Sequence, residues 1–313
     1  MHAKLPLTVA CPRALRPAVL RLLHDGLPSD QQGGLAQTLH SIGVHDESAW
    51  DGLLVTLADS ELASDVSGVA WVQLLAGETA CLWIPPEQGA SNRPLLRAAA
   101  SFVDARDIPL AQLVVGESDG YATEFLEEAG FPKFAELLYL YADLSTAVPP
   151  GPATRRHQQP EEPAFVGHAG NDGDRFGKLL ERTYIGTLDC PGLDGIRPLR
   201  QVLEGYRSQG NHRPEHWYTL LEGDQDVGAL ILTEHRGLGN WELIYMGLVP
   251  EVRGRGWGSR VVQFALQVAA SEGAERLVLA VDANNQPALK VYRRLGFVDW
   301  ARRIVYARLQ SRV

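Results

Sequence analysis

The sequence predicts an α/β fold, with an α+β mixed sheet, built as two tandem domains. Three observations predict it. The chain has 313 residues, which is more than one average domain needs. Its second half alternates apolar strand patterns with amphipathic helix patterns, and its first half repeats part of that order. A segment rich in proline and polar residues separates the halves, so we expect domains at 1–145 and 164–313 and a linker at 146–163.

The composition narrows the class of protein. Hydrophobic residues make up 45% of the chain and charged residues 21%, as in ordinary soluble globular proteins. The formal net charge of −9 argues against a nucleic-acid binder, because such proteins concentrate Lys and Arg against phosphates. We find no signal-peptide layout and no membrane-spanning apolar run. We therefore expect a cytoplasmic protein with a small-molecule or protein partner, without contact to membranes.

Cysteine and histidine usage predicts no metal site. Cys11, Cys81 and Cys190 lie too far apart in the sequence for a CxxC motif, and three cysteines do not form a disulfide framework. The nine histidines show neither HxxxH nor HExxH spacing, which would place two ligands on one helix face. A reducing compartment fits this pattern.

The second half opens with two helical patterns, near 174–186 and 196–210. Strand patterns follow at 216–223, 226–235 and 240–249, and the first two are joined by a GDQD turn. A mixed sheet therefore begins here.

Another strand–helix–strand unit follows a glycine-rich stretch, VPEVRGRGWGS. The apolar positions from Val261 to Ala269 predict a helix ending at Gly273, and RLVLAV at 276–281 reads as a buried parallel strand. A helix at 286–295, with Asn285 as N-cap, and a last strand at 302–309 complete the chain. The crossover between the parallel strands should be right-handed.

The glycine-rich stretch stands at the start of a helix, where unpaired backbone N–H groups and the helix dipole favour an anion. Glycine lets such a backbone approach a ligand closely, and arginine adds positive charge. The residues concerned are Arg253, Gly254, Arg255, Gly256, Gly258 and Arg260. The pattern predicts a diphosphate site.

Two other interpretations were considered for this stretch. A flexible strand-to-helix turn remains open, because glycine-rich patterns alone are weakly specific. A dinucleotide-binding fold fits less well, since GRGWG is not GxGxxG. Asp282 stands where a ribose-binding acid could, but only 31 residues follow it, too few for the further strand–helix units that fold needs.

These residues resemble the GCN5-related N-acetyltransferase (GNAT) family, whose members transfer acetyl from acetyl-CoA to an amine. The family's loop reads R/Q-x-x-G-x-G/A, and Arg253, Gly256 and Gly258 match it. A second family pattern is matched by NQPALKVYRRLGF, from Asn285 to Phe297. The resemblance covers about 165–309, and it implies acetyl-CoA as co-substrate and acetyltransferase-like domains.

The resemblance also implies which residues bind acetyl-CoA. The pyrophosphate would lie on the amides of 253–259, and the pantetheine would pair with the backbone near Leu248. The implied set is Leu248, Val249, Arg253, Gly254, Arg255, Gly256, Trp257, Gly258, Ser259, Asn285 and Tyr292. Asn285 is equally explained as a helix cap alone, which needs only its side-chain oxygen.

Two catalytic residues are expected. Tyr292 is the candidate general acid, since a neutral phenol can protonate a leaving thiolate; without its neighbours it would be core packing. Freeing an alkylammonium of its proton costs about 4 kcal/mol at pH 7, so a base is expected. We favour Glu242, which resembles the glutamate base of the histone acetyltransferase branch. Strand alternation would place it with Ile244 and Met246.

Glu242 has alternatives: it is equally explained as a solvated strand carboxylate, and another residue or a water chain can serve as base. An amide near Met246 would be the oxyanion donor by resemblance. For the acceptor amine, the stretch RTYIGTLDCPGLDG offers Tyr184, Asp189 and Asp194, with Trp217 as an aromatic wall. The alternative is that these are ordinary loop acids.

The first half carries a degenerate copy of the pattern. GYATEFLEEAGF resembles the second family pattern, and Phe131 and Phe297 are 166 residues apart. At that offset Arg253, Gly256 and Gly258 become Glu87, Ala90 and Asn92, and Asn285, Tyr292 and Glu242 become Asp119, Leu126 and Ala76. Because the chemical groups are lost, we expect one CoA per chain. The tandem layout is similar to mycothiol synthase, without a marker for that substrate.

The sequence therefore predicts an acetyl-CoA-dependent N-acetyltransferase that acts on a primary amine of a small molecule by direct attack. A protein N-terminus or lysine is the variant acceptor. A non-catalytic acyl-CoA-binding sensor or scaffold is the other class, but a pure binder would have no use for the phenol of Tyr292.

Overall fold

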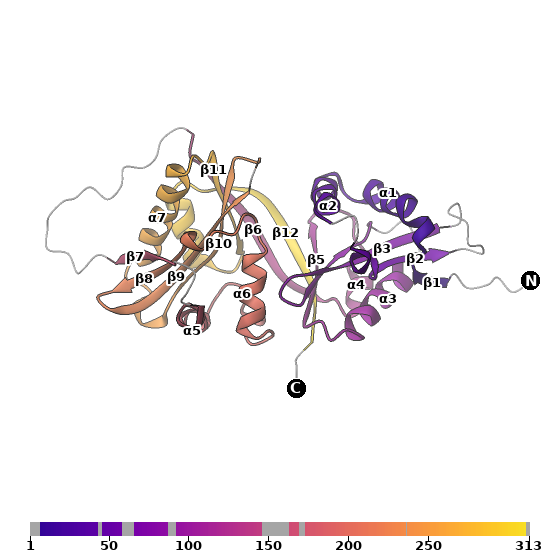
Figure 1. Ribbon diagram of the computed structural model, residues 1–313, viewed down its shortest axis with the longest axis horizontal. Coiled ribbons are helices and arrows are strands. Elements are labelled where there is room, and N and C mark those ends of the chain that lie inside the picture. The colour runs from indigo at the N-terminus through magenta and orange to yellow at the C-terminus, as the bar shows by residue number, and fades with distance from the viewer. Residues whose placement is uncertain are drawn as a thin grey trace, which may run out of the picture. The chain divides into compact units, whose positions relative to one another are not determined.

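A computed structural model describes residues 7–42, 46–57, 66–86, 92–145, 163–168, 173–235 and 237–310 (Figure 1). The chain divides into two compact units. Unit 1 consists of Met1–Phe134 with Ile304–Val313, and unit 2 consists of Ala135–Arg303. Each unit has its own core, so we describe them separately.

Unit 1 is a sheet with helices packed on it. Its strands are β1 (Leu7–Ala10), β2 (Leu53–Leu57), β3 (Val66–Leu75), β4 (Thr79–Trp83) and β5 (Leu110–Gly116), in that order. Its helices are α1 (Arg16–Gly26), α2 (Ser29–Ser41), α3 (Asn92–Asp104) and α4 (Thr123–Glu128). Strands β1 to β4 pair antiparallel, and β4 and β5 pair parallel. Leu95, Ala99 and Val103 recur every fourth residue along α3 and are all buried, which explains the helix's place on the sheet.

Unit 2 repeats this plan. Its strands are β6 (Lys133–Asp143), β7 (Ala164–Gly167), β8 (Trp217–Glu222), β9 (Gln225–His235), β10 (Asn240–Leu248), β11 (Arg276–Asp282) and the first half of β12 (Val298–Leu309). Its helices are α5 (Gly173–Tyr184), α6 (Leu199–Arg207), α7 (Trp257–Ser271) and α8 (Gln286–Arg294). The strand order is β12-β6-β11-β10-β9-β8-β7. The expected mixed α/β fold with two units of related plan is thereby confirmed.

The parallel crossover β10–α7–β11 is confirmed, since Asn240 to Glu242 pair in parallel with Arg276 to Val278. The last strand is longer than the pattern at 302–309 indicated and starts at Val298. The extra residues are polar or exposed, and so give little periodic signal: Val298 is 49% and Trp300 51% exposed.

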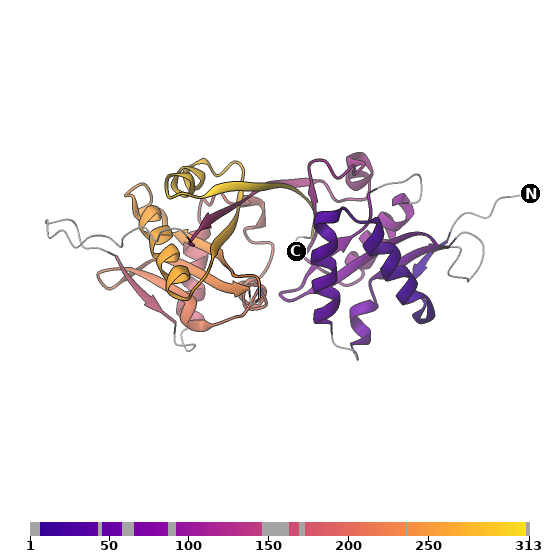
Figure 2. The ribbon, with the colours of Figure 1, turned by 90° about the horizontal axis from the view of Figure 1, so that it is seen from above.

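Two strands, β6 and β12, each contain residues of both units. Strand β6 belongs to the N-terminal half of the sequence, yet most of it pairs with β11 in unit 2. The end of β12 belongs to unit 1, where Tyr306 is 2% exposed in the core and Arg308 binds Asp104 at 2.7 Å. Figures 1 and 2 draw β12 as one yellow strand, whose residues up to Arg303 belong to unit 2 and whose residues from Ile304 belong to unit 1.

This exchange changes how the chain divides. The compact units separate at 134 and at 303 rather than at one linker. The linker expected at 146–163 lies, except for its last residue, outside the described residues. The domain boundaries 1–145 and 164–313 therefore stay a prediction.

Candidate active site

Strands β10 and β11 part from each other in the middle of unit 2. Their parallel pairing ends at Glu242 opposite Val278, although β10 continues to Leu248 and β11 to Asp282. Backbone groups of the two strands beyond that point are left facing an opening. The opening was not visible in the sequence, because strand patterns report burial and not pairing.

The register shows which amides of β10 face this opening. The Val249 N–H donates to the Val227 carbonyl at 2.9 Å, so alternate residues of β10 bond toward β9. The amide groups of Met246 and Leu248 therefore point the other way, toward β11. An extended molecule that carries amide groups can pair with them there.

The turn after β10 contains two glycines in a backbone conformation that favours glycine. Gly254 and Gly256 have φ of 78° and 82°, a backbone conformation that other residues adopt at a cost. A Cβ on either would meet nothing within 4 Å, so backbone conformation alone requires glycine there. Gly256 is the N-cap of the 15-residue helix α7, and no side chain caps it. The first amides of α7 are thus available to an anion.

The Arg253 side chain bonds to three backbone carbonyls, and its expected role in binding acetyl-CoA stays a prediction. Its guanidinium donates to the carbonyls of Leu248 at 3.0 Å, Gly186 at 3.0 Å and Thr183 at 2.9 Å. It thereby ties the end of β10 to the last turn of α5, where a cation also favours the helix dipole. The side chain shapes the site, and its charge is largely taken up by these carbonyls.

Other arginines stand closer to the helix start. Arg255 forms an ion pair with Glu222 at 3.4 Å. Arg294, at the end of α8, donates to the Ser259 hydroxyl at 2.6 Å in the first turn of α7. The sequence reasoning missed Arg294, whose only signal was its place two residues after the candidate acid Tyr292.

Tyr292 lies on α8 with 5% of its surface exposed, and its ring contacts Phe297 at 5.6 Å. Burial, together with the charge of Asp189, raises the pKa of its phenol, which therefore stays protonated at neutral pH. Within the described residues its hydroxyl makes no hydrogen bond. The group is a proton donor without a partner.

Asp189 is fixed beside Tyr292 by a reciprocal set of hydrogen bonds. The Asp282 N–H donates to Asp189 Oδ1 at 2.8 Å, and the Cys190 N–H donates to Asp282 Oδ2 at 3.3 Å. Asn285 donates to Asp189, and its own oxygen accepts from the Ala288 N–H at 3.3 Å. The helix-cap interpretation of Asn285 is thus confirmed. Cys190 has φ 45°, so strain accompanies this arrangement.

The Asp189 carboxyl has a raised pKa, first because of burial and also because of the neighbouring Asp282 carboxylate. Next to it stand three tyrosines. The Tyr184 hydroxyl lies 3.1 Å from that of Tyr206, and the rings of both approach Tyr245 at 5.5 and 5.7 Å. Burial raises the pKa of Tyr245, and the Asp189 charge adds to it. Tyr184 thus lies against Tyr245, and the charge of Asp189 acts on Tyr245.

Of the other two residues expected around the acceptor, Asp194 adds its charge to burial in raising the pKa of Tyr184, whereas Trp217 lies in the core of unit 2. Trp217 is 6% exposed and packs on Phe176 at 5.5 Å in the core of unit 2. Asp194 is exposed on the α5–α6 connection. We leave both out of the site proposed below.

Glu242 stands at the closed end of the opening. Its carboxylate lies 2.6 Å from Nε2 of His235, and this hydrogen bond raises the pKa of His235. Val278, its partner on β11, is four residues before Asp282, which is about 13 Å along a strand. Glu242 therefore approaches the opening from the end opposite to Asp189.

The predicted side-chain alternation on β10 was wrong. The register shifts between Leu243 and Tyr245, so Ile244 is an extra residue in a β-bulge. The residues opposite Glu242 and Tyr245 are two positions apart on β9, so these side chains share a face, and Met246 lies on the other. The bulge thus places Glu242 and Tyr245 on the face covered by α5.

Comparison with known proteins agrees with this geometry. Residues 183–297 match the Acetyltransferase (GNAT) family. The chain is 34% identical over 100 residues to N-alpha-acetyltransferase 30 of Schizosaccharomyces pombe, a match covering 31% of this chain and 67% of that protein. The chain belongs to the GNAT family. The expected enzyme class, an acyltransferase of GNAT type, is confirmed with it.

Other similarities are shorter or more distant. A mycothiol acetyltransferase of Corynebacterium aurimucosum is 43% identical over 56 residues, 18% of each chain, so this chain matches only a small part of that relative. A GNAT structure from Sphaerobacter thermophilus has a TM-score of 0.66 at 17% identity and covers 98% of this chain and 97% of that chain. A tandem GNAT protein from the clavulanic acid pathway has a TM-score of 0.53 at 13% identity, covering 96% and 98%. These structures show the fold.

In the GNAT copy of unit 1, the strand register changes which residue corresponds to Glu242. Val278 pairs with Glu242, and 166 residues earlier Gln112 pairs with Cys81. Cys81, and not Ala76, therefore stands in place of Glu242. The expected offset failed upstream because β10 continues to Leu248, six residues past Glu242, whereas β4 ends at Trp83, two residues past Cys81.

A small cavity lies between α3 and α4 in this copy. The Tyr121 hydroxyl donates to the Ile84 carbonyl at 2.8 Å, and Asn92 donates to the Pro85 carbonyl at 3.0 Å. With Leu126 they border a cavity of only about 10 Å³. Glu87 and Ala90, the counterparts of Arg253 and Gly256, lie outside the described residues. Asp119 accepts from the Gly116 N–H.

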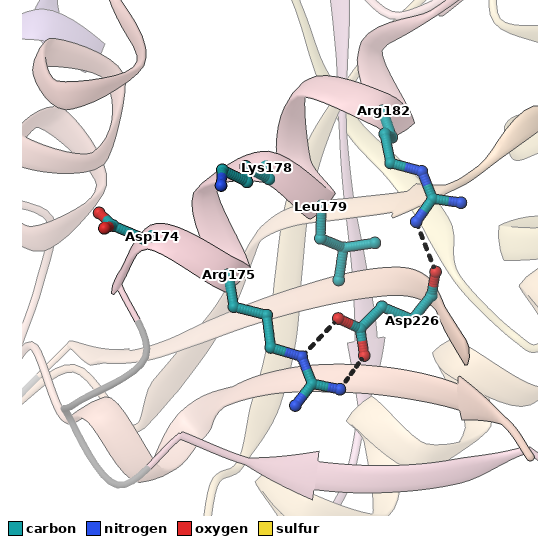
Figure 3. A pocket seen from close by; sticks show the side chains of 6 residues that line it. All are labelled: Asp174, Arg175, Lys178, Leu179, Arg182 and Asp226. Atoms are coloured by element: carbon teal, nitrogen blue, oxygen red, sulfur yellow. Dashed lines mark hydrogen bonds and ion pairs between the residues drawn. The ribbon is translucent and has the colours of Figure 1, made fainter. Parts of the chain in front are cut away.

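Another hollow of about 430 Å³ lies on α5 (Figure 3). It is lined by Asp174, Arg175, Lys178, Leu179, Arg182 and Asp226. Arg175 holds the Asp226 carboxylate through two bonds of 2.7 Å, and Arg182 donates to the Asp226 carbonyl at 3.0 Å. It contains none of the residues expected in the site.

Across the described ranges, no three His, Cys, Asp or Glu side chains gather in a way that could hold a metal ion. In the same ranges, no helix has the length and apolar character needed to cross a membrane.

Proposed function

We propose that the chain transfers the acetyl group of acetyl-CoA to the primary amine of a small molecule, at a site in unit 2. The observation that carries the proposal is the loss of pairing between β10 and β11, followed by the glycine turn, together with the phenol of Tyr292, which has no hydrogen-bond partner among the described residues. In this proposal 164–313 is the catalytic domain and 1–145 a degenerate one, in a cytoplasmic protein.

The residues around the opening fit acetyl-CoA, the co-substrate of the family. It supplies the acetyl thioester. The amides of Met246 and Leu248 suit the pantetheine, and the turn from Arg253 to Ser259 suits the diphosphate because its glycines leave room. Arg255 and Arg294 add positive charge, while Arg253 holds the turn in place.

The chain's own groups then carry the proton movements. Glu242 receives the proton of the acceptor ammonium through water, while Asp189 at the other end of the opening and the ring of Tyr184 attract the cation into the site. The Met246 amide stabilises the oxyanion that forms on attack. Tyr292, kept protonated by burial, donates its proton to the departing thiolate.

A protein N-terminus is the second acceptor class. One observation favours it: the relative that the chain matches over 67% of its length is named an N-alpha-acetyltransferase. A small amine remains our first proposal because Asp189 offers a carboxylate to a cation beside the acid.

Release of the CoA thiol from acetyl-CoA, measured over a panel of small amines and peptides, tests both. We expect release with small primary amines and little with lysine or N-terminal peptides. Acetyl-CoA binding without thiol release from any acceptor would favour the sensor or scaffold instead.

A further inference from the structure

Strand β6 adds two tyrosines to the face of the sheet that carries Glu242. Glu242 is opposite Val278 on β11, and Val278 is opposite Tyr141 on β6. Ala280 is likewise opposite Tyr139. Because directly paired residues point to the same side of a sheet, these side chains form one continuous surface.

This surface is open to solvent. On β11 and β6 the residues facing α7 are buried, whereas Val278, Ala280, Tyr139 and Tyr141 are half-buried. Trp300 on β12 is 51% exposed, and its ring centroid lies 6.3 Å from those of both tyrosines. We call Tyr139, Tyr141 and Trp300 the aromatic strip. A half-exposed tryptophan against two tyrosines is a surface suited to a ring.

The charges beside the aromatic strip argue against a cation on it. The Arg276 guanidinium already lies 5.6 Å from the centre of the Tyr141 ring. Arg302 pairs with Glu136 at 3.0 Å, so that carboxylate is compensated. The strip therefore favours a flat, uncharged body over an ammonium group.

We propose that the aromatic strip binds the planar apolar body of the acceptor, whose amine reaches across Val278 to Glu242. The inference rests on the proposed function and names its substrate class, an arylalkyl primary amine. Two strand spacings of about 4.8 Å separate the backbones of Tyr141 and Glu242, so an alkyl chain must join ring and amine. The N-terminal half, which has lost its own chemistry, thereby contributes a substrate-binding strand to the catalytic unit.

The test compares kcat/KM for phenylalkyl amines with that for alkyl amines of equal chain length. In the unchanged protein we expect the ring to raise kcat/KM at least about 10-fold, the scale of one well-placed aromatic contact. Trp300→Ala should remove most of this gain in kcat/KM, and Trp300→Phe should retain part of it. Leu238→Ala, which changes an apolar residue 57% exposed on the β9–β10 connection, should leave the ratio as it is.

A second measurement separates this inference from the proposed function. Saturation-transfer NMR with a phenylalkyl alcohol, which cannot be acetylated, should show ring contact that Trp300→Ala removes. If the unchanged protein and Trp300→Ala both acetylate amines with the same ratio of kcat/KM for phenylalkyl to alkyl amines, the aromatic strip does not bind the acceptor. The proposed function would then still stand. Ring contact without any turnover would support the strip and count against the enzyme. A strip that instead holds two chains together, shown by a dimer that Trp300→Ala dissociates, would overturn the inference.

Discussion

One oxygen atom distinguishes Tyr292 from a phenylalanine that would fill the same space. Its ring is buried against Phe297 and its hydroxyl has no partner among the described residues. Tyr292→Phe should therefore lower kcat about 10- to 10³-fold and leave acetyl-CoA affinity within a few-fold. Stopped-flow thiol release and calorimetry would measure the two. An equal loss in both would show that the phenol binds rather than donates.

Glu242 and His235 form a pair whose pH dependence can be measured. The pKa of His235 is raised by the Glu242 carboxylate, against the effect of burial. The stabilisation by this pair is therefore full below the unfolded pKa of histidine and is lost as the pH rises through the raised value. In Glu242→Gln we expect a lower His235 pKa by NMR, and a loss of unfolding free energy seen at pH 5.5 that shrinks by pH 8.5.

The same substitution tests the base. Glu242→Gln should lower turnover about 10²-fold at neutral pH and recover in part as rising pH supplies free amine. Glu272→Gln is the control, because it removes a carboxylate charge on the surface, in an ion pair with Arg213 and outside the opening. An unchanged pH–rate profile in Glu242→Gln would take Glu242 out of the mechanism.

At the residue scale, the sequence predicted identities better than contacts. Gly254 and Gly256 were predicted for their backbone freedom, and both have positive φ. The carbonyl contacts of Arg253 and the bulge at Ile244 were not predictable, because each depends on strands and helices far apart in the sequence. Asp189 carried only a generic acidic signal until the Asp282 amide fixed it.

At the scale of elements, the turn after β10 holds two parts of the site together. Arg253 spans from Leu248 to the end of α5 through three carbonyls. Arg253→Ala should therefore lower the unfolding free energy by about 1–3 kcal/mol and raise the KM for acetyl-CoA. Arg255→Ala, whose ion pair with Glu222 is exposed, should change stability by less than about 0.5 kcal/mol. Denaturant unfolding of both variants measures the contrast; equal effects would contradict it.

Helices and strands could be predicted from the sequence where their buried residues recur with a regular period. Helix α7 and strand β11 match the apolar patterns from which they were predicted. The parting of β10 from β11 could not be predicted, because both strands keep the same apolar pattern whether or not they pair. The pairing of β6 with unit 2 and the place of the end of β12 in unit 1 could not be predicted either, because the sequence of a strand does not indicate its partner strand.

At the scale of the whole molecule, two GNAT-like units should bind one CoA. Unit 1 has Leu126 where unit 2 has the phenol of Tyr292, and the cavity beside Leu126 has a volume of only about 10 Å³. Calorimetry should give one site per chain. Gly256→Glu should abolish it, because bulk, negative charge and a φ of 82° all oppose binding or folding of that turn. Two sites, or one that survives Gly256→Glu, would place the CoA in the other unit.

The exchanged strand makes the C-terminal residues part of unit 1. The Ala307 N–H donates to the Pro132 carbonyl at 3.0 Å and Tyr306 lies in the core. A chain ending at Arg303 should therefore lose stability mainly in unit 1. Hydrogen exchange of β5 and α3 should rise while that of β9 stays slow. Faster exchange confined to unit 2 would contradict the assignment.

The same strand sets an order on the protein's synthesis. A ribosome produces β1 to β5 before unit 2, and residues 304–309 only after unit 2. Domains made early in translation commonly fold before the rest of the chain emerges. Here unit 1 lacks its last strand segment until the residues of unit 2 have been translated, and the edge of β5 stays uncovered for that whole time. Unit 1 therefore cannot complete its sheet before the residues of unit 2 have emerged.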